Sequence, residues 1–143
     1  TIEAIIKPTS GAIATPHIIS NRQCRLWVDW AAGANRLGFG RTSATSIYSA
    51  NGSIVSGAWS HVLAASDAAG ATSLYINGVL SGAAGQAGGT PAAGADSFIG
   101  NLAALTSPLG SDSALLRIWG KELSASDASA LYRRERWRTG TAS

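Results

Sequence analysis

The chain has 143 residues, enough for one domain with its own hydrophobic core, and its single cysteine, Cys24, excludes an internal disulfide. It carries 11 Lys and Arg against 8 Asp and Glu, and the net charge of +3 comes from the four arginines and one glutamate among residues 133–138. The other charges cancel, so the composition predicts a basic tail on a neutral domain and excludes a nucleic-acid-binding surface. Residues 68–95 are uncharged, but their glycines, Asn77 and Pro91 exclude a membrane-spanning helix.

Most of the sequence consists of short segments rich in β-branched and aromatic residues, bounded by Gly, Pro, Asn or Ser. This pattern is typical of an all-β sandwich. We expect strands at residues 2–7, 16–20, 23–30, 36–39, 46–49, 59–65, 73–76, 97–99 and 114–119. The pairs Asn51-Gly52 and Asn77-Gly78 predict tight turns, because Asn and Gly tolerate the positive φ that such turns require.

Two segments depart from the strand pattern. Residues 81–95 are almost entirely Gly and Ala, which predicts a long loop, because they offer little apolar area to offset the entropy of ordering. Residues 124–134 predict the one helix. Ser124 and Asp127 form a variant of the capping box, and an apolar stripe follows at Ala128, Leu131 and Tyr132.

Five short motifs occur in an order that matches a known family. They are TIEAIIKP at residues 1–8, WSHV at 59–62, LYING at 74–78, FIG at 98–100, and LRIW at 116–119 followed by LSA at 123–125. Through them the chain resembles the laminin G-like jelly-roll family of the concanavalin A-like superfamily, from which it departs at Ile5, Leu63 and Asp127-Ala128. The resemblance implies an all-β jelly-roll sandwich of two antiparallel sheets with one short C-terminal helix, formed by residues 1–134, with a basic tail at 135–143.

Members of that family carry an opening strand before the segment that corresponds to residues 1–8. This chain starts at Thr1 and has no room for it. The resemblance therefore predicts that the opening strand is missing and that a larger polypeptide or an oligomer completes the sheet edge, because an unpaired edge exposes N–H and C=O groups.

Alternate residues of the expected strand 23–30 lie on opposite faces of a sheet. One face is predicted to be core and consists of Cys24, Leu26, Val28 and Trp30. The other face carries Arg25, Trp27 and Asp29, an indole between a cation and an anion. A sugar ring can stack on such a ring while the charges bind its hydroxyls, so these three residues are the predicted glycan site. The alternative is that Trp27 only covers the sheet or packs under a loop.

The resemblance also implies a calcium site, because many such domains bind calcium through Asp and carbonyl oxygens at a sheet rim. The candidate ligands here are Asp96, Asn101 and Asp112. Calcium takes six to eight oxygens, so a site with so few carboxylates is expected to bind weakly. The alternative is that these acids cap turns. We expect no other cofactor.

Neither histidine is predicted to have a catalytic or metal-binding role. The resemblance implies a packing and hydrogen-bonding role for His61, and His17 with the one cysteine does not make a zinc site. Glucanases that share the resemblance use acids two or four residues apart on one strand, whereas the nearest acids here, Glu122 and Asp127, are five apart. The sequence therefore predicts a protein that is not an enzyme.

The basic tail is the last distinctive feature, and its candidate partner-docking residues are Arg133, Arg134, Arg136, Trp137 and Arg138. Arg and Trp are enriched at interface hot spots, so this segment is predicted to bind an acidic partner surface or an anionic polysaccharide. The alternative is a solvated helix end, where cations are favourably placed.

These features together predict a non-catalytic module that binds a glycan or a cell-surface polysaccharide in adhesion, with an extracellular, cell-surface or virion-associated location. The alternative function is a structural, decoration or tail-associated protein of a phage virion built on the same fold. A glycoside-active enzyme is the third hypothesis. No nucleic-acid partner and no membrane insertion are expected.

Overall fold

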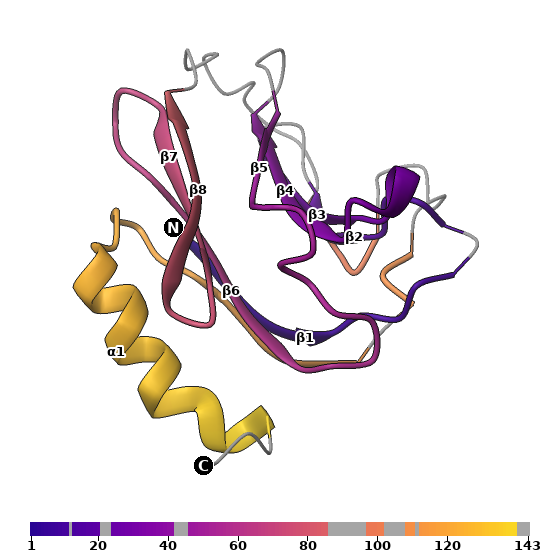
Figure 1. The fold of residues 1–143 in the computed structure, drawn as a ribbon. Coiled ribbons are helices and arrows are strands. Elements are labelled where there is room, and N and C mark those ends of the chain that lie inside the picture. Colours follow the sequence, from indigo (N-terminus) through magenta and orange to yellow (C-terminus); the bar gives the residue numbers. More distant parts are fainter. Residues whose placement is uncertain are drawn as a thin grey trace.

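The computed structural model describes residues 1–11, 13–20, 24–41, 46–85, 97–101, 108–110 and 112–139. These residues form a β-sandwich with one α-helix (Figure 1). Its strands are β1 (Ile2–Lys7), β2 (His17–Ser20), β3 (Cys24–Asp29), β4 (Arg36–Arg41), β5 (Ile47–Tyr48), β6 (Ser60–Ser66), β7 (Ala71–Ile76), β8 (Val79–Gly85), β9 (Phe98–Ile99) and β10 (Asp112–Ile118). Its helices are η1 (Ala31–Gly33), α1 (Ala125–Glu135) and η2 (Arg136–Thr139), of which η1 and η2 are of the 3₁₀ type.

The strands form two five-stranded antiparallel sheets. The first sheet has the order β10-β1-β6-β7-β8 and the second has the order β5-β4-β3-β2-β9. This arrangement confirms the predicted jelly-roll sandwich of two antiparallel sheets with one short C-terminal helix. No helix in the described part of the chain combines the length and the hydropathy needed to span a bilayer.

The main core lies between the two sheets. It is built from alternate residues of paired strands. These include Ala4 and Ile6 of β1, Leu26 and Val28 of β3, Leu37 of β4, Val62 and Ala64 of β6, and Leu74 of β7. Alternation along each strand therefore decides which side chains enter the core and which face outward. Leu26 and Val28 confirm the predicted core face of β3, and the partly buried Cys24 and Trp30 pack against it.

Helix α1 packs on the face of the first sheet that points away from the second sheet (Figure 1). Leu131 and Ala128 of α1 form a smaller core with Leu63 and Ala65 of β6 and with Tyr75 of β7. The predicted capping box is present, because the backbone N–H of Asp127 donates to Ser124 Oγ and the backbone N–H of Ser124 donates to Asp127 Oδ2. The local sequence thus fixes where α1 begins.

The expected loop at residues 81–95 is wrong for its first five residues. These belong to β8, which pairs with β7 from Ile76↔Val79 to Ala71↔Gly85 after the predicted Asn77-Gly78 turn. Backbone hydrogen bonds with β7 order this segment, so it does not depend on large apolar side chains. A Cβ at Gly82 would collide with the backbone of Tyr48, and the N–H of Ala50 donates to the carbonyl of Ser81 over 2.8 Å. Small residues therefore let the two sheets meet at β5 and β8, while residues 86–95 lie outside the described residues.

Candidate functional site

Trp27 lies on the outer face of the second sheet, and it is buried rather than exposed. Its side chain retains only 8% exposure, because it lies over the neighbouring strand β4 at Gly38, its partner across the ladder. A Cβ at Gly38 would collide with the indole, and one at Gly40 would approach it to 3.3 Å. The expectation of an exposed stacking ring at Trp27 is therefore wrong, since the two glycines leave the space into which the indole folds.

Two more rings flank this indole and form an aromatic row with it. The ring centroids of His17 and Trp27 are 5.9 Å apart, and those of Trp27 and Tyr48 are 5.9 Å apart in an edge-to-face arrangement. This geometry is favourable for aromatic pairs. The aromatic row, defined as His17, Trp27 and Tyr48, thus crosses the second sheet from β2 to β5, and Tyr48 is its exposed end at 37% exposure.

Asp29 lies at the end of the same strand face and does not point to solvent. Its side chain is buried, Oδ2 accepts a hydrogen bond from Arg36 Nε over 2.9 Å, and Oδ1 accepts one from the N–H of Ala31 over 3.0 Å. The guanidinium of Arg36 in turn lies 3.8 Å from the ring centroid of Tyr48, a cation–π contact. Asp29 therefore positions Arg36 against the exposed end of the aromatic row. The expectation that Asp29 faces a ligand directly is wrong, because its carboxylate is buried.

Arg25 is the exposed member of the predicted glycan site. Burial and then the positive charge of Arg25 lower the pKa of His17, so the histidine is neutral at neutral pH. His17 Nδ1 is buried and has no hydrogen-bond partner among the described residues. Among the described residues of this site, two arginines, Arg25 and Arg36, stand against one carboxylate, that of Asp29.

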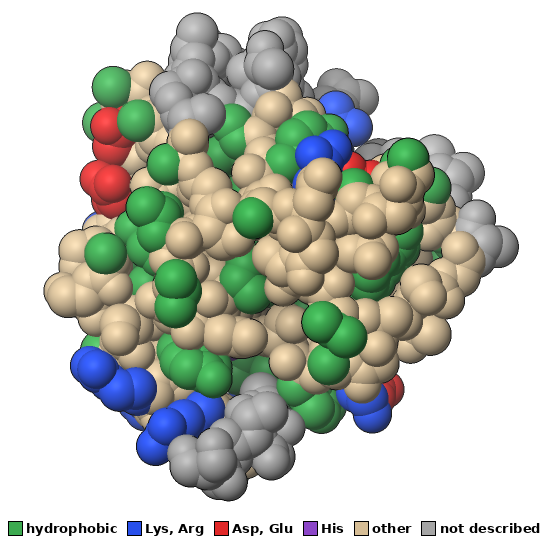
Figure 2. Space-filling view, viewed as in Figure 1, with side chains coloured by type: hydrophobic (Ala, Val, Ile, Leu, Met, Phe, Trp, Pro, Cys, Tyr) green, Lys and Arg blue, Asp and Glu red, His purple; other side chains and the backbone are tan. Residues whose placement is uncertain are grey.

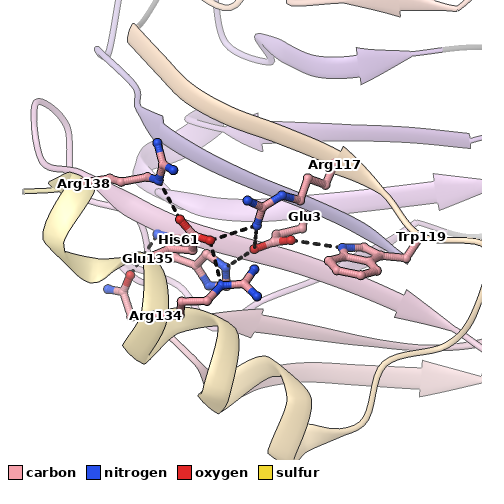
Figure 3. A network of polar contacts seen from close by, with 8 residues as sticks. Glu3, His61, Arg117, Trp119, Arg134, Glu135 and Arg138 are labelled. Carbon is pink, nitrogen blue, oxygen red and sulfur yellow. Dashed lines mark hydrogen bonds and ion pairs between the residues drawn. The ribbon is translucent and has the colours of Figure 1, made fainter.

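A second group of polar side chains is buried between the first sheet and the end of α1 (Figure 3). Glu3 of β1 and His61 of β6 are both fully buried, and His61 Nε2 lies 3.1 Å from Glu3 Oε1. The other carboxylate oxygen of Glu3 accepts a hydrogen bond from Trp119 Nε1 over 3.0 Å. The packing and hydrogen-bonding role that the resemblance implied for His61 is confirmed.

The charge state of Glu3 follows from its partners. Burial alone would raise the pKa of this carboxyl, but the hydrogen bonds from His61 and Trp119 and the nearby charge of Arg117 outweigh it and lower the pKa. An ionised carboxylate only accepts hydrogen bonds, so Nε2 of His61 carries the proton that is shared with Glu3. This buried pair is part of the structural framework and is closed to a ligand.

Glu135 ends α1 and binds three arginines at once (Figure 3). Its Oε1 accepts from Arg117 Nη1 over 3.0 Å and from Arg134 Nε over 2.9 Å, and its Oε2 accepts from Arg138 Nε over 2.6 Å. Burial alone would raise its pKa, but these hydrogen bonds lower the pKa of Glu135 to about 2. Glu135 is therefore ionised at neutral pH and holds the end of α1 against β10.

Glu135→Gln is expected to destabilise the domain at neutral pH by roughly 2 kcal/mol, with allowance for solvent screening of the partly exposed guanidiniums. The native pKa of about 2 lies below the ordinary value of 4.5, so the ionised carboxylate stabilises the fold above pH 4.5 and this stabilisation is lost as the pH falls toward 2. Urea unfolding at neutral pH and at about pH 3 measures the difference between the two proteins, which should shrink in acid. An equal difference in stability at both pH values would contradict this role. Glu122→Gln, at an exposed position, is the control and should change stability little at either pH.

The predicted docking residues divide into two sets. Arg134 and Arg138 bind Glu135, so part of the basic tail is committed to the fold. Arg133, Arg136 and Trp137 are exposed, and Trp137 retains 64% of its surface with the guanidinium of Arg138 4.5 Å from its ring centroid. The partner-docking role of all five residues remains a prediction.

Comparison with known proteins places the chain in a family. The model of the concanavalin A-like lectin/glucanases superfamily matches residues 1–129. The chain belongs to this superfamily. No curated protein matches the sequence.

Two solved structures have a fold similar to that of this chain. A candidate carbohydrate binding protein from Bacteroides ovatus is 17% identical with a TM-score of 0.70 over 90% of this chain and 39% of its own. The receptor binding domain of botulinum neurotoxin type G is 15% identical with a TM-score of 0.69 over 94% of this chain and 37% of its own. The chain thus spans about two fifths of each neighbour, and at these identities the likeness shows the shared fold alone.

The calcium site implied by the family resemblance is not tested by the described residues. Asp96 lies outside them, Asn101 follows β9 at one edge of the second sheet, and Asp112 begins β10 at one edge of the first sheet. Within the described ranges no group of three or more His, Cys, Asp or Glu side chains could hold a metal ion. Calcium binding by Asp96, Asn101 and Asp112 remains a prediction.

Sequence reasoning missed Tyr48 and Arg36, which carry the exposed part of the second-sheet site. Tyr48 pairs with Gly38, which pairs with Trp27 on its other side. The signal was present in the alternation of β3, β4 and β5, but using it requires the register between three strands. The sequence of one strand predicts which side chains share a face, but it does not predict which residues of other strands lie beside them.

Proposed function

We propose that the chain is a non-catalytic carbohydrate-binding module that binds a glycan or a cell-surface polysaccharide, outside the cell, on the outer face of the second sheet. The observation that carries the proposal is the exposed end of the aromatic row, where Tyr48 contacts both the guanidinium of Arg36 and the buried Trp27. Arg25 lies two residues from Trp27 along β3 and is exposed. Support also comes from the superfamily and from the Bacteroides ovatus neighbour, a candidate carbohydrate binding protein.

Each predicted glycan-site residue has a distinct part in this proposal. Arg25 donates hydrogen bonds to sugar hydroxyls, because a guanidinium has five N–H donors and accepts none. Trp27 is the floor that supports Tyr48, and Asp29 fixes the guanidinium of Arg36. The amphipathic ring of Tyr48 supplies apolar contact for the sugar while its hydroxyl stays in water.

Arg25→Gln and Tyr48→Leu are each expected to weaken glycan binding about tenfold, as the loss of a charged hydrogen bond or a stacked ring does. Thermal stability should change little, since Arg25 is exposed and Leu keeps apolar cover over Trp27. A glycan array selects the ligand, and titration calorimetry with calcium and then with a chelator measures the affinity. Val79→Ala, an exposed position on the first sheet, is the matched control.

Three results would count against this proposal. Binding that is unaffected by both substitutions would place the glycan elsewhere. No binding to any glycan would remove the proposed function. A polysaccharide that releases reducing ends during incubation would instead identify a glycoside-active enzyme.

A structural role in an assembly such as a phage virion is the second candidate function. The observation that favours it is exposed apolar side chains on the outermost strands of the first sheet, namely Val79 and Leu80 of β8 and Ile118 of β10. Exposed strand edges of this kind pair readily with other chains. Sedimentation velocity decides, because a single monomeric species at all concentrations would remove this candidate.

A further inference from the structure

Among the described residues, the end of α1 carries more positive than negative charge. Three guanidiniums, those of Arg117, Arg134 and Arg138, surround the carboxylate of Glu135, and we call these four residues the guanidinium cluster. Arg117 also faces the buried carboxylate of Glu3 at 3.6 Å, so the excess charge lies on Arg134 and Arg138. Arg133 and Arg136 lie beside it and are exposed. Figure 2 shows Lys and Arg side chains gathered at the lower left, over α1 near its C-terminal end.

The guanidinium cluster has donors that face solvent. Arg134 and Arg138 are 57% and 38% exposed at the side chain, and each contacts Glu135 through Nε. Among the described residues, no hydrogen bond is formed by their terminal amino groups. Glu135 therefore orients these two guanidiniums while leaving their outer edges able to bind a second anion.

An exposed aromatic ring adjoins the guanidinium cluster. Trp137 is 64% exposed, and Arg138 contacts both its ring and Glu135. One face of the ring contacts the guanidinium of Arg138, and the exposed remainder offers an apolar surface on which a sugar ring can pack. The ring and the cluster therefore form one continuous surface.

A groove of about 280 Å³ leads away from the guanidinium cluster along α1. It is lined by Lys121, Leu123, Asp127, Leu131, Trp119 and Arg134, so Arg134 belongs both to the groove and to the cluster. The carboxylate of Asp127 accepts hydrogen bonds from Ser124 but keeps its charge, so the groove lining carries two cations, Lys121 and Arg134, against one carboxylate. A groove of this volume that shares Arg134 with the cluster fits one linear sugar chain better than the broad surface of a protein partner, which usually buries about 800 Å² on each side.

We propose that this end of the domain is a second binding site, for a polysaccharide that carries sulfate or carboxylate groups. The anionic groups bind the outer edges of Arg134 and Arg138, and a sugar ring packs on the open face of Trp137. Glu135 is a positioning residue that orients the guanidiniums. The site lies on the side of the first sheet away from the second sheet, so it is independent of the aromatic row.

Titration calorimetry of the full chain with heparin, polygalacturonate and neutral dextran tests this site, at low and at physiological salt. Heparin supplies sulfates and polygalacturonate supplies carboxylates, so the two arms separate the anion types. We expect binding of at least one polyanion that weakens as salt rises, and no binding of dextran. The double variant R134Q/R138Q should lose tenfold or more in affinity, because each substitution removes a charged hydrogen-bond donor and the loss of one such bond is enough for about a tenfold change.

Two further variants separate a built site from general charge attraction. W137A, which removes an exposed side chain and leaves the cluster intact, should weaken polyanion binding by about threefold or more. K7Q removes one positive charge at the end of β1 that pairs with Asp112, outside both proposed sites, and should change it less than about twofold, because distant charges are screened. Equal losses in K7Q and R134Q/R138Q would overturn the site in favour of net charge alone.

The remaining outcomes also overturn the proposal. Binding of polyglutamate as tight as that of either polysaccharide, without dependence on Trp137, would assign the surface to an acidic polypeptide. Binding of dextran as tight as that of heparin would remove the role of the anionic groups. Failure of all three polysaccharides to bind the native chain would remove the site, while leaving the second-sheet proposal to its own test.

Discussion

Glu3→Ala is expected to lower the free energy of unfolding by about 4 kcal/mol, because two donors inside the protein lose their acceptor at a cost of roughly 1 to 3 kcal/mol each. The carboxylate of Glu3 is fully buried and accepts hydrogen bonds from His61 and Trp119, with Arg117 Nη1 3.6 Å from Oε1. Truncation leaves the ring N–H groups of His61 and Trp119 without acceptors inside the protein. Urea unfolding at neutral pH, with two variants and a control, measures the loss.

The controls for Glu3 separate charge from shape. Glu3→Gln keeps the volume and one acceptor oxygen, so its loss should be intermediate. Glu122→Ala removes an exposed carboxylate and should change stability by no more than about 0.5 kcal/mol. If Glu3→Ala cost no more than Glu122→Ala, the carboxylate would not hold His61 and Trp119 together, and the assigned network would be incorrect.

The fold could be predicted because its signals are local. Alternation placed Leu26 and Val28 in the core, Asn77-Gly78 gave the hairpin turn, and Ser124 gave the start of α1. Strand β8 could not be predicted in this way, because it is held by backbone hydrogen bonds to β7 and by a close approach of the sheets at Gly82. The Gly and Ala content of residues 81–85 predicted a loop because it offers little side-chain area, whereas the backbone hydrogen bonds that stabilise β8 do not depend on composition.

The contacts of the candidate sites depend on residues far apart in the sequence. A hydrogen-bonding role for His61 could be predicted, but its partner Glu3 is 58 residues away and is visible only once β1 lies beside β6. Glu135 was predicted to begin the basic tail, yet it ends α1 and Arg117 of β10 fixes it to the sheet. Strand order and register, which no single segment contains, decide these contacts.

The burial of Trp27 depends on a residue that carries no side chain. Gly38→Ala is expected to destabilise the domain by about 3 kcal/mol, because an added Cβ collides with the indole in a packed site. Gly120→Ala is the control, since a Cβ at that position meets no heavy atom within 4 Å. Thermal and urea unfolding of both variants give the comparison.

A double-mutant cycle assigns the cost of Gly38→Ala to the indole itself. In a Trp27→Leu background the same change should cost less than about 1 kcal/mol, because the smaller side chain leaves room for the new methyl group. A cost that stays near 3 kcal/mol in both backgrounds would mean that Gly38 is required by the strand and not by Trp27. If the cycle shows coupling, then the glycine in β4 is what turns a potential stacking ring into the floor of the site, and Tyr48 is left as the ring that a sugar can reach.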